Sequence, residues 1–177
     1  MDENTLKLYQ SSGSPNSRRV RIFLAEKGLK VPLIPVDLGK GEQHTEAYRA
    51  INPRRVIPTL VIEDGTAIGE VPAILRYLEE IHPRTPLHGE TAKERALTAM
   101  WERRVEQEGF ASVMEAIRNT ATGLKGRAIA GPHSIADITA MVTIDFAAKA
   151  INFAVPEEHA ALKRWYDQVS RRPSAKA

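Results

Sequence analysis

The 177-residue sequence contains no cysteine. No disulfide, zinc–thiolate site or thiol nucleophile can form from its own side chains, so any sulfur chemistry must use sulfur that arrives with a ligand. Long hydrophobic runs are also missing, because no apolar stretch reaches the roughly 20 residues of a membrane-spanning helix. Residues 1–4 lack the basic and apolar regions of a signal peptide. We therefore expect a cytoplasmic protein that does not act in a membrane.

Composition and charge set weaker limits. Hydrophobic residues make up 42% and charged residues 27%, which is the balance of an ordinary globular protein with a real core. The formal net charge of +3 slightly favours anionic small molecules and gives little reason to expect a nucleic-acid partner. The histidines show no metal-ligand spacing, so we predict no metal site.

The N-terminal half alternates strand and helix signals. Residues 6–9 favour a short strand, and Ser14-Pro15 then places serine at the N-cap and proline at the first position of a helix that ends at Gly28. Two prolines in residues 31–38 restrict that apolar segment to an edge strand. Residues 40–50 are polar and are expected to be irregular or briefly helical.

A hairpin and a helix follow in the same half. The Asp64-Gly65 turn separates a strand at 59–62 from a return strand through Ile68, and a helix is expected from Pro72 to Ile81. The order βαβαββα predicts a mixed four-stranded sheet, with a parallel first pair of strands and an antiparallel last pair.

The C-terminal half carries only helix signals. Residues 83–92 contain two prolines and are typical of a linker, after which apolar residues repeat at helical spacing. Ser134 followed by Asp137 resembles a capping box at the start of a largely apolar helix. We therefore predict an α/β domain at 1–82, a linker at 83–92 and an all-α domain at 93–177.

A site for a small acidic peptide is indicated by the segment after Asn52-Pro53. Pro58 opens a run of β-formers, which suits the start of a strand, and the Ile57–Pro58 bond is a candidate for the cis form. A cis proline would turn the N–H and C=O groups of Ile57 outward, where they could pair with an extended peptide. Glu70, at the mouth of the next helix, could hold that peptide's amino end.

Four motifs occur in order along the chain: Ser14-Pro15 with Arg19-Val20-Arg21; Asn52-Pro53 with Val56-Ile57-Pro58-Thr59-Leu60; Glu70 with Ala73-Ile74 and Tyr77-Leu78; and Ser134-Ile135-Ala136-Asp137-Ile138. Together they resemble the soluble, cytosolic glutathione S-transferases over almost the full length, as a serine-type bacterial member. The resemblance implies a thioredoxin-like N-terminal domain that binds glutathione, an all-α C-terminal domain and a homodimer. Family members have another long helix just before the capping box, whereas here residues 131–133 lead directly into Ser134. The helical domain is therefore expected to be shorter by one helix.

The resemblance also assigns catalysis to Ser14. A thiol with a pKa of about 8.5 is ionised more readily when a hydroxyl at a helix N-terminus donates a hydrogen bond to its thiolate, beside the positive end of the helix dipole. Ser14 matches the active-site serine of the serine classes, although capping the helix would explain it equally well. Ser11, Ser12 and Ser17 are competing hydroxyls in the same turn, and Tyr9 is a weaker candidate.

The remaining glutathione contacts are expected from three segments. Ile57, presented by Pro58, would bond the cysteinyl main chain, and Glu70 would take the γ-glutamyl ammonium. The other contacts expected by resemblance are Ser12 in the serine turn, Gln43 and His44 for the glycyl carboxylate with Lys40 as an alternative, and Val71.

Val71 stands where the family has serine. If Pro72 is the first helical residue, Val71 is the N-cap and forfeits roughly 1 kcal/mol against serine. We therefore hypothesise that the γ-glutamyl carboxylate of bound glutathione caps this helix.

These features predict a detoxifying transferase that conjugates glutathione, as co-substrate, to hydrophobic electrophiles, with no metal and no nucleic-acid partner. Two alternatives stay open. The serine-rich turn before Arg19-Val20-Arg21 resembles the glutathione-dependent isomerases, although their cysteine is absent, and some relatives reduce peroxides. Other relatives are interaction modules without catalytic activity, which would suit a shortened helical half.

Overall fold

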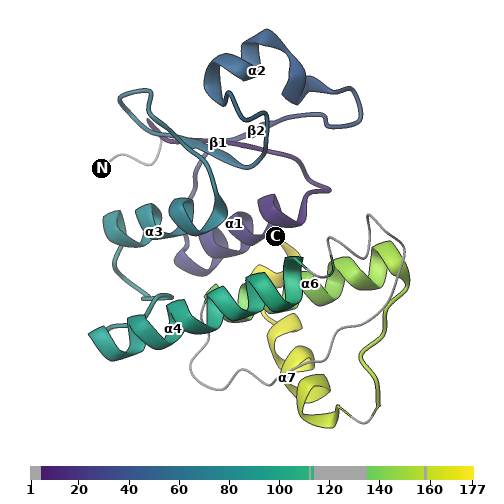
Figure 1. The fold of residues 1–177 in the computed structure, drawn as a ribbon. Coiled ribbons are helices and arrows are strands. Elements are labelled where there is room, and N and C mark those ends of the chain that lie inside the picture. Colours follow the sequence, from purple (N-terminus) through teal and green to yellow (C-terminus); the bar gives the residue numbers. More distant parts are fainter. Residues whose placement is uncertain (1–4, 112, 114–134, 158) are drawn as a thin grey trace. The chain divides into compact units, whose positions relative to one another are not determined.

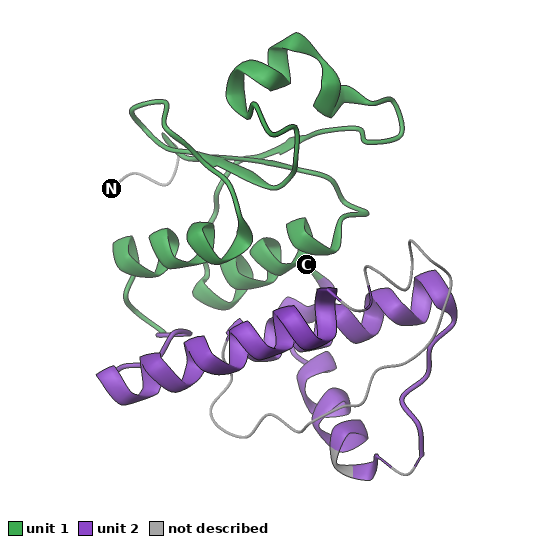
Figure 2. Ribbon diagram, in the orientation of Figure 1, with its two compact units in different colours: residues 1–85, 177 green, residues 86–176 purple. Residues whose placement is uncertain are grey.

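The computed structural model describes residues 5–111, 113, 135–157 and 159–177 (Figure 1). The chain divides into two compact units, residues 1–85 with residue 177, and residues 86–176 (Figure 2). The boundary between them falls inside the proline-containing segment 83–92.

The first unit is built on a four-stranded mixed sheet in the order β2-β1-β3-β4 (Figure 1). Its strands are β1 (Lys7–Gln10), β2 (Leu33–Pro35), β3 (Thr59–Val61) and β4 (Ala67–Ile68). β1 pairs in parallel with β2 and antiparallel with β3, and β3 pairs antiparallel with β4. The predicted mixed four-stranded sheet, its parallel first pair, its antiparallel last pair and the edge position of β2 are confirmed. Proline fits that edge because it cannot donate to a ladder.

Helices cover both faces of this sheet. They are α1 (Pro15–Lys27), a short 3₁₀ helix (Glu42–His44), α2 (Glu46–Ile51) and α3 (Val71–Ile81). α1 and α3 pack side by side on one face, and α2 lies on the other (Figure 1). The core of the unit consists of fully buried apolar side chains from the residue before β1, from β1 and β3, and from α1 and α3: Leu6, Leu8, Val20, Phe23, Leu60, Ile74, Leu75 and Leu78.

The ends of α1 follow from local sequence signals. The Ser14 side chain accepts a hydrogen bond from the Ser17 N–H at 3.3 Å, and Pro15 is the first helical residue. Gly28 closes the helix with φ of 66°, in the left-handed region that costs glycine little. Both predicted ends are confirmed.

The start of α3 corrects a prediction. The helix begins at Val71, and its N-cap is Glu70, with φ of 61° and ψ of 123°. Val71 is therefore not the N-cap. Glu70 makes no side-chain cap hydrogen bond, so the hypothesis that a ligand carboxylate caps this helix stays a prediction, with Glu70 in place of Val71 as the N-cap. Proline is tolerated throughout a first turn, where its missing N–H would lack an intrahelical partner anyway, so Pro72 does not fix the starting residue.

Lys27 joins the end of α1 to the end of α3. Its side chain is fully buried, and its ammonium lies 2.6 Å from a carboxylate oxygen of Glu79. The same group donates to the carbonyl oxygens of His82 at 2.6 Å and Arg84 at 3.0 Å, and lies 5.5 Å from the centre of the Phe23 ring. A single buried cation therefore anchors α3 and the chain that leaves it.

Every regular element that the structure describes in the second unit is a helix. Its elements are α4 (Ala92–Arg104), a π-helix (Val105–Phe110), α6 (Ile135–Ile151), α7 (Ala160–Ser170) and a 3₁₀ helix (Pro173–Lys176). α4 opens with a complete capping box formed by Thr91 and Glu94. Within the described ranges, no helix combines the length and the apolar character that crossing a membrane requires.

Buried polar bonds join the helices of this unit. The Trp165 Nε1–H donates to Asp137 Oδ1 at 2.7 Å, and the Thr139 hydroxyl donates to Glu102 Oε1 at 2.8 Å. Ser134, the predicted capping partner of Asp137, and residues 131–133, where the family's extra helix was expected to be missing, lie outside the described residues.

Candidate functional site

The turn between β1 and α1 presents the Ser14 hydroxyl at a helix N-terminus. Ser14 is half-buried, its N–H donates to the Ser11 carbonyl at 3.1 Å, and its carbonyl accepts from the Arg18 N–H at 3.0 Å. Its Oγ accepts one bond from Ser17, and among the described residues its hydroxyl proton has no acceptor. A hydroxyl can donate one bond as well as accept two, so this donor is available to an anion.

Arg21 holds the same turn from α1. Its guanidinium donates to Gln10 Oε1 at 2.7 Å, to the Ser11 carbonyl at 3.4 Å and to the Ser12 carbonyl at 3.3 Å. Burial, and then the charge of Arg18, lowers the pKa of Arg21 below its ordinary value. In the sequence, Arg21 stands out only as part of a motif, and its contacts with this turn gave no signal, because a pattern does not show where a long side chain reaches.

The competing hydroxyls differ in their surroundings. Ser17 is completely buried, and its Oγ accepts a bond from the Ser11 N–H at 3.3 Å. Ser12 is exposed. The Tyr9 ring packs edge-on against Tyr48, with centroids 6.1 Å apart. Ser14 is therefore the serine of this group that combines helix capping with an available hydroxyl proton.

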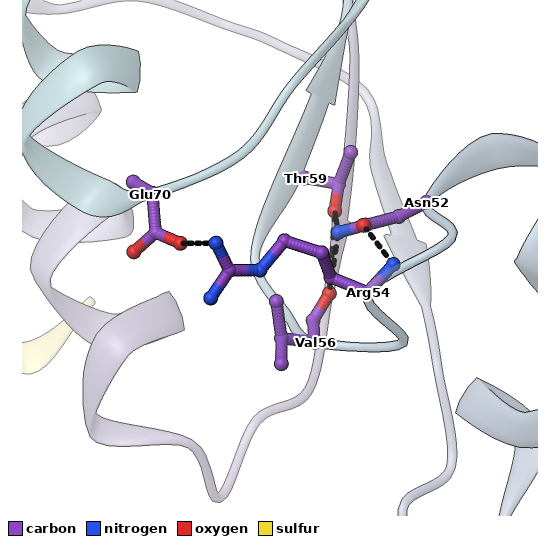
Figure 3. Close-up of polar contacts among 5 residues, drawn as sticks. All are labelled: Asn52, Arg54, Val56, Thr59 and Glu70. Carbon is purple, nitrogen blue, oxygen red and sulfur yellow. Dashed lines mark hydrogen bonds and ion pairs between the residues drawn. The ribbon is translucent and has the colours of Figure 1, made fainter.

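The loop before β3 is held by buried side chains that converge on the Val56 carbonyl oxygen. Tyr48 donates to it at 2.7 Å. Asn52 donates to it at 3.0 Å and Thr59 at 3.3 Å (Figure 3). Asn52 also donates to the Thr59 hydroxyl at 2.8 Å. Burial raises the pKa of Tyr48, which keeps its phenol a neutral donor. The Asn52-Pro53 pair signalled a loop, but nothing in the sequence revealed this network.

The Ile57–Pro58 peptide bond in this loop is cis. Among the described residues, neither the N–H nor the C=O of Ile57 takes part in a hydrogen bond. Pro58 is buried and Ile57 is half-buried, so the loop presents one main-chain donor and one acceptor from a fixed support.

Glu70 lies at the entrance to α3 and faces Arg54. The nearest approach is 3.5 Å between Arg54 Nη1 and Glu70 Oε1, and the two side chains are 76% and 64% exposed (Figure 3). The Glu70 carbonyl accepts bonds from Ala73 and Ile74, each at 3.1 Å. The Arg54 N–H donates to Asn52 Oδ1 at 3.0 Å. Both backbones are therefore anchored, while both charged groups reach into solvent.

The remaining predicted ligands have varied surroundings. Gln43 and His44 belong to the 3₁₀ helix after β2, where Gln43 Oε1 is buried without a partner among the described residues and His44 is exposed. Lys40 pairs with Asp37 at 3.4 Å. Val71 is buried in the core of the unit, so only its main chain could meet a ligand.

No three histidine, aspartate or glutamate side chains gather into a possible metal site in the part of the chain that the structure describes.

Comparison with known proteins places these features in a family. Residues 13–81 match the family model described as glutathione S-transferase, N-terminal domain. Glutathione S-transferase 2 of Saccharomyces cerevisiae is 31% identical over an alignment of 204 positions that covers 96% of this chain and 87% of the yeast protein. That alignment is longer than the chain, so the yeast protein contains residues that have no counterpart here.

Two further proteins, one matched by sequence and one by structure, are similar to this chain. A maleylacetoacetate isomerase of Dictyostelium discoideum is 44% identical over 99 residues, which covers 55% of this chain and 45% of that protein. The crystal structure of a glutathione S-transferase domain-containing protein from Marinobacter aquaeolei VT8 is 31% identical, covers 95% of this chain and 98% of that chain, and has a TM-score of 0.82. The predicted fold class, a thioredoxin-like N-terminal domain with an all-α C-terminal domain, is confirmed.

Proposed function

The chain belongs to the glutathione S-transferase family, and from this premise we propose that it conjugates glutathione to hydrophobic electrophiles as a serine-type transferase. Ser14 donates a hydrogen bond from its hydroxyl to the glutathione sulfur, which favours the thiolate. The thiol proton passes to solvent, and the thiolate attacks the electrophile. The protein supplies binding, orientation and a lowered thiol pKa, and forms no covalent intermediate of its own.

The observation that carries this proposal is the hydrogen bonding of Ser14. Its Oγ accepts from Ser17 and thereby completes the cap of α1, while its proton stays available to a ligand. A hydrogen bond to the charged form of a group lowers that group's pKa, and the positive end of the α1 dipole acts in the same direction. The bracing of the turn by Arg21 fixes this geometry before the ligand arrives.

Glutathione is proposed to lie along the loop before β3. The unpaired main-chain groups of Ile57 suit its cysteinyl residue, and the carboxylate of Glu70 suits the γ-glutamyl ammonium. Pro58 supports Ile57. Further contacts are proposed from Ser12, Gln43, His44 and the main chain of Val71.

Replacing Ser14 tests the proposal. Ser14→Ala also weakens the helix cap by about 1 kcal/mol, whereas Ser14→Gly costs the cap only a few tenths, so the glycine variant separates catalysis from folding. We expect both variants to lose at least about tenfold in kcat/KM toward an aromatic halide at neutral pH, and to recover at high pH, where glutathione ionises unaided. Ser11→Ala is the matched control. Unchanged turnover in Ser14→Gly would remove Ser14 from the mechanism.

A glutathione-dependent double-bond isomerase is the second candidate, favoured by the match to the Dictyostelium isomerase. Both reactions begin with attack by the same thiolate, so the residues proposed above serve either one. A panel of soft electrophiles and cis-configured unsaturated diacids separates them. Turnover of the diacids alone, with glutathione regenerated, would favour isomerisation over conjugation.

We further propose that the protein is a cytoplasmic homodimer. Leu97 and Met100, on α4, are 45% and 36% exposed, which leaves apolar surface that a second copy could cover. Sedimentation of the wild type and of Leu97→Glu tests this, and a monomeric wild type would refute it.

A further inference from the structure

We propose that Arg54 is a specificity-determining residue that binds the α-carboxylate of the γ-glutamyl group while Glu70 binds its ammonium. The inference rests on the proposed glutathione site and assigns to it a residue that neither the motifs nor the family resemblance singled out. The pair would recognise the zwitterionic amino-acid end of the tripeptide as a unit.

The two charges are arranged as such a zwitterion needs them. An α-amino acid carries its ammonium and carboxylate on one carbon, so its complement is a carboxylate and a cation side by side. Arg54 Nη1 and Glu70 Oε1 are 3.5 Å apart (Figure 3). A guanidinium has five N–H donors in a planar fork, so Arg54 can keep an edge toward Glu70 and offer other donors to a carboxylate.

The backbones of Arg54 and Glu70 are held by hydrogen bonds, although both side chains are exposed. The N–H of Arg54 is held by the buried Asn52, whose own side chain bonds Val56 and Thr59. Glu70 adopts φ of 61°, and its carbonyl caps the first turn of α3. The two side chains therefore start from anchored backbones and end in exposed charged groups, which a ligand can reach.

The existing pair does not oppose ligand binding strongly. Side chains 76% and 64% exposed gain little from each other, because exposed ion pairs are worth about 0–1 kcal/mol. An incoming zwitterion replaces one such contact with two. The residue after Glu70 is the buried Val71, whose side chain has no donor, so Arg54 supplies the side-chain donor for a carboxylate at this end of α3.

Calorimetric titration with three peptides tests the inference. The peptides are glutathione, 4-aminobutanoyl-cysteinyl-glycine, which lacks the α-carboxylate, and glutaryl-cysteinyl-glycine, which lacks the ammonium. We expect Arg54→Gln to bind glutathione about five- to tenfold more weakly than the wild type and to bind the peptide without the carboxylate equally well. Glu70→Gln should show the reciprocal pattern, losing affinity for glutathione but not for the glutaryl peptide. Arg55→Gln, in the adjacent exposed position, is the matched control and should stay within about twofold of the wild type.

The possible results separate this inference from the proposal beneath it. If the wild type binds no glutathione, both are overturned. If the wild type binds but Arg54→Gln binds as tightly or more tightly, Arg54 is only a competitor for Glu70, and the inference alone fails. If Arg54→Gln loses the same affinity for glutathione and for the peptide without the carboxylate, Arg54 acts through the loop and not through the carboxylate. That result would also overturn the inference.

Discussion

Lys27→Met is expected to lower the free energy of unfolding more than the same change at an exposed lysine. The substitution preserves the length and apolar stem of a side chain that is fully buried, and removes its charge. Glu79, only 13% exposed, would then lose a cation 2.6 Å away, and two carbonyl oxygens at the end of α3 would lose their donor.

The magnitude follows from the burial of this pair. Removing one partner of a buried ion pair costs about 3–5 kcal/mol, and the residual exposure of Glu79 favours the lower end, about 3 kcal/mol. For a chain of this length, that corresponds to a fall in Tm of about 6–12 °C. Removing both charges, in Lys27→Met with Glu79→Leu, should restore most of the loss, because neither member of the buried ion pair then remains without the other.

Urea unfolding followed by circular dichroism, together with thermal melts, measures these changes. Lys40→Met is the matched control, because Lys40 is 77% exposed in its pair with Asp37 and should leave the unfolding free energy unchanged within error. Equal stability of Lys27→Met and Lys40→Met would refute the reasoning. So would a double variant no more stable than Lys27→Met alone.

Three further substitutions probe other parts of the structure. Gly89→Ala should lower the free energy of unfolding by about 1–3 kcal/mol, because Gly89 has φ of 105° and a new Cβ would lie 2.7 Å from Glu94 Cβ. Gly13→Ala is the control: a Cβ there meets nothing within 4 Å, so steric contact should not change the unfolding midpoint. Backbone hydrogen bonds lower the folded pKa of Glu94 below 4.5, so the stability that Glu94 contributes is present above about pH 4.5 and is lost as pH falls through the folded pKa. Glu94→Gln should therefore lose less stability than the wild type between pH 6 and pH 3, measured by urea unfolding. An equal loss in the two proteins would contradict this. Asn52→Ala should lower the free energy of unfolding by roughly 2 kcal/mol and weaken glutathione binding, because it removes a buried donor to the Val56 carbonyl. Unchanged thermal melting and unchanged affinity would show that the loop keeps its shape without Asn52.

Elements with local signals at both ends were predictable from the sequence. Ser14-Pro15 and Gly28 define α1 through a side-chain cap and a left-handed glycine, both of which depend only on neighbours in the chain. The edge position of β2 followed in the same way from the chemistry of proline, which cannot donate within a sheet.

Long-range contacts were not predictable in this way. In the sequence, Lys27 reads as an ordinary cation in the last turn of a helix. Only the packing of α1 against α3 buries it and lets it donate to the carbonyl of His82, 55 residues away. Arg54 likewise gave no signal, because its partner Glu70 lies across a strand and a hairpin. The start of α3 was misplaced by one residue because a proline is compatible with several positions of a first turn.

The central claim concerns the sulfur of bound glutathione, and the ultraviolet absorbance of its thiolate tests that claim most directly. In a pH titration with saturating protein, this band should appear well below the free thiol's pKa of about 8.5, and Ser14→Gly should return its appearance toward that pH. A band that rises in the wild type at the same pH as in free glutathione, although calorimetry shows the peptide bound, would contradict the account.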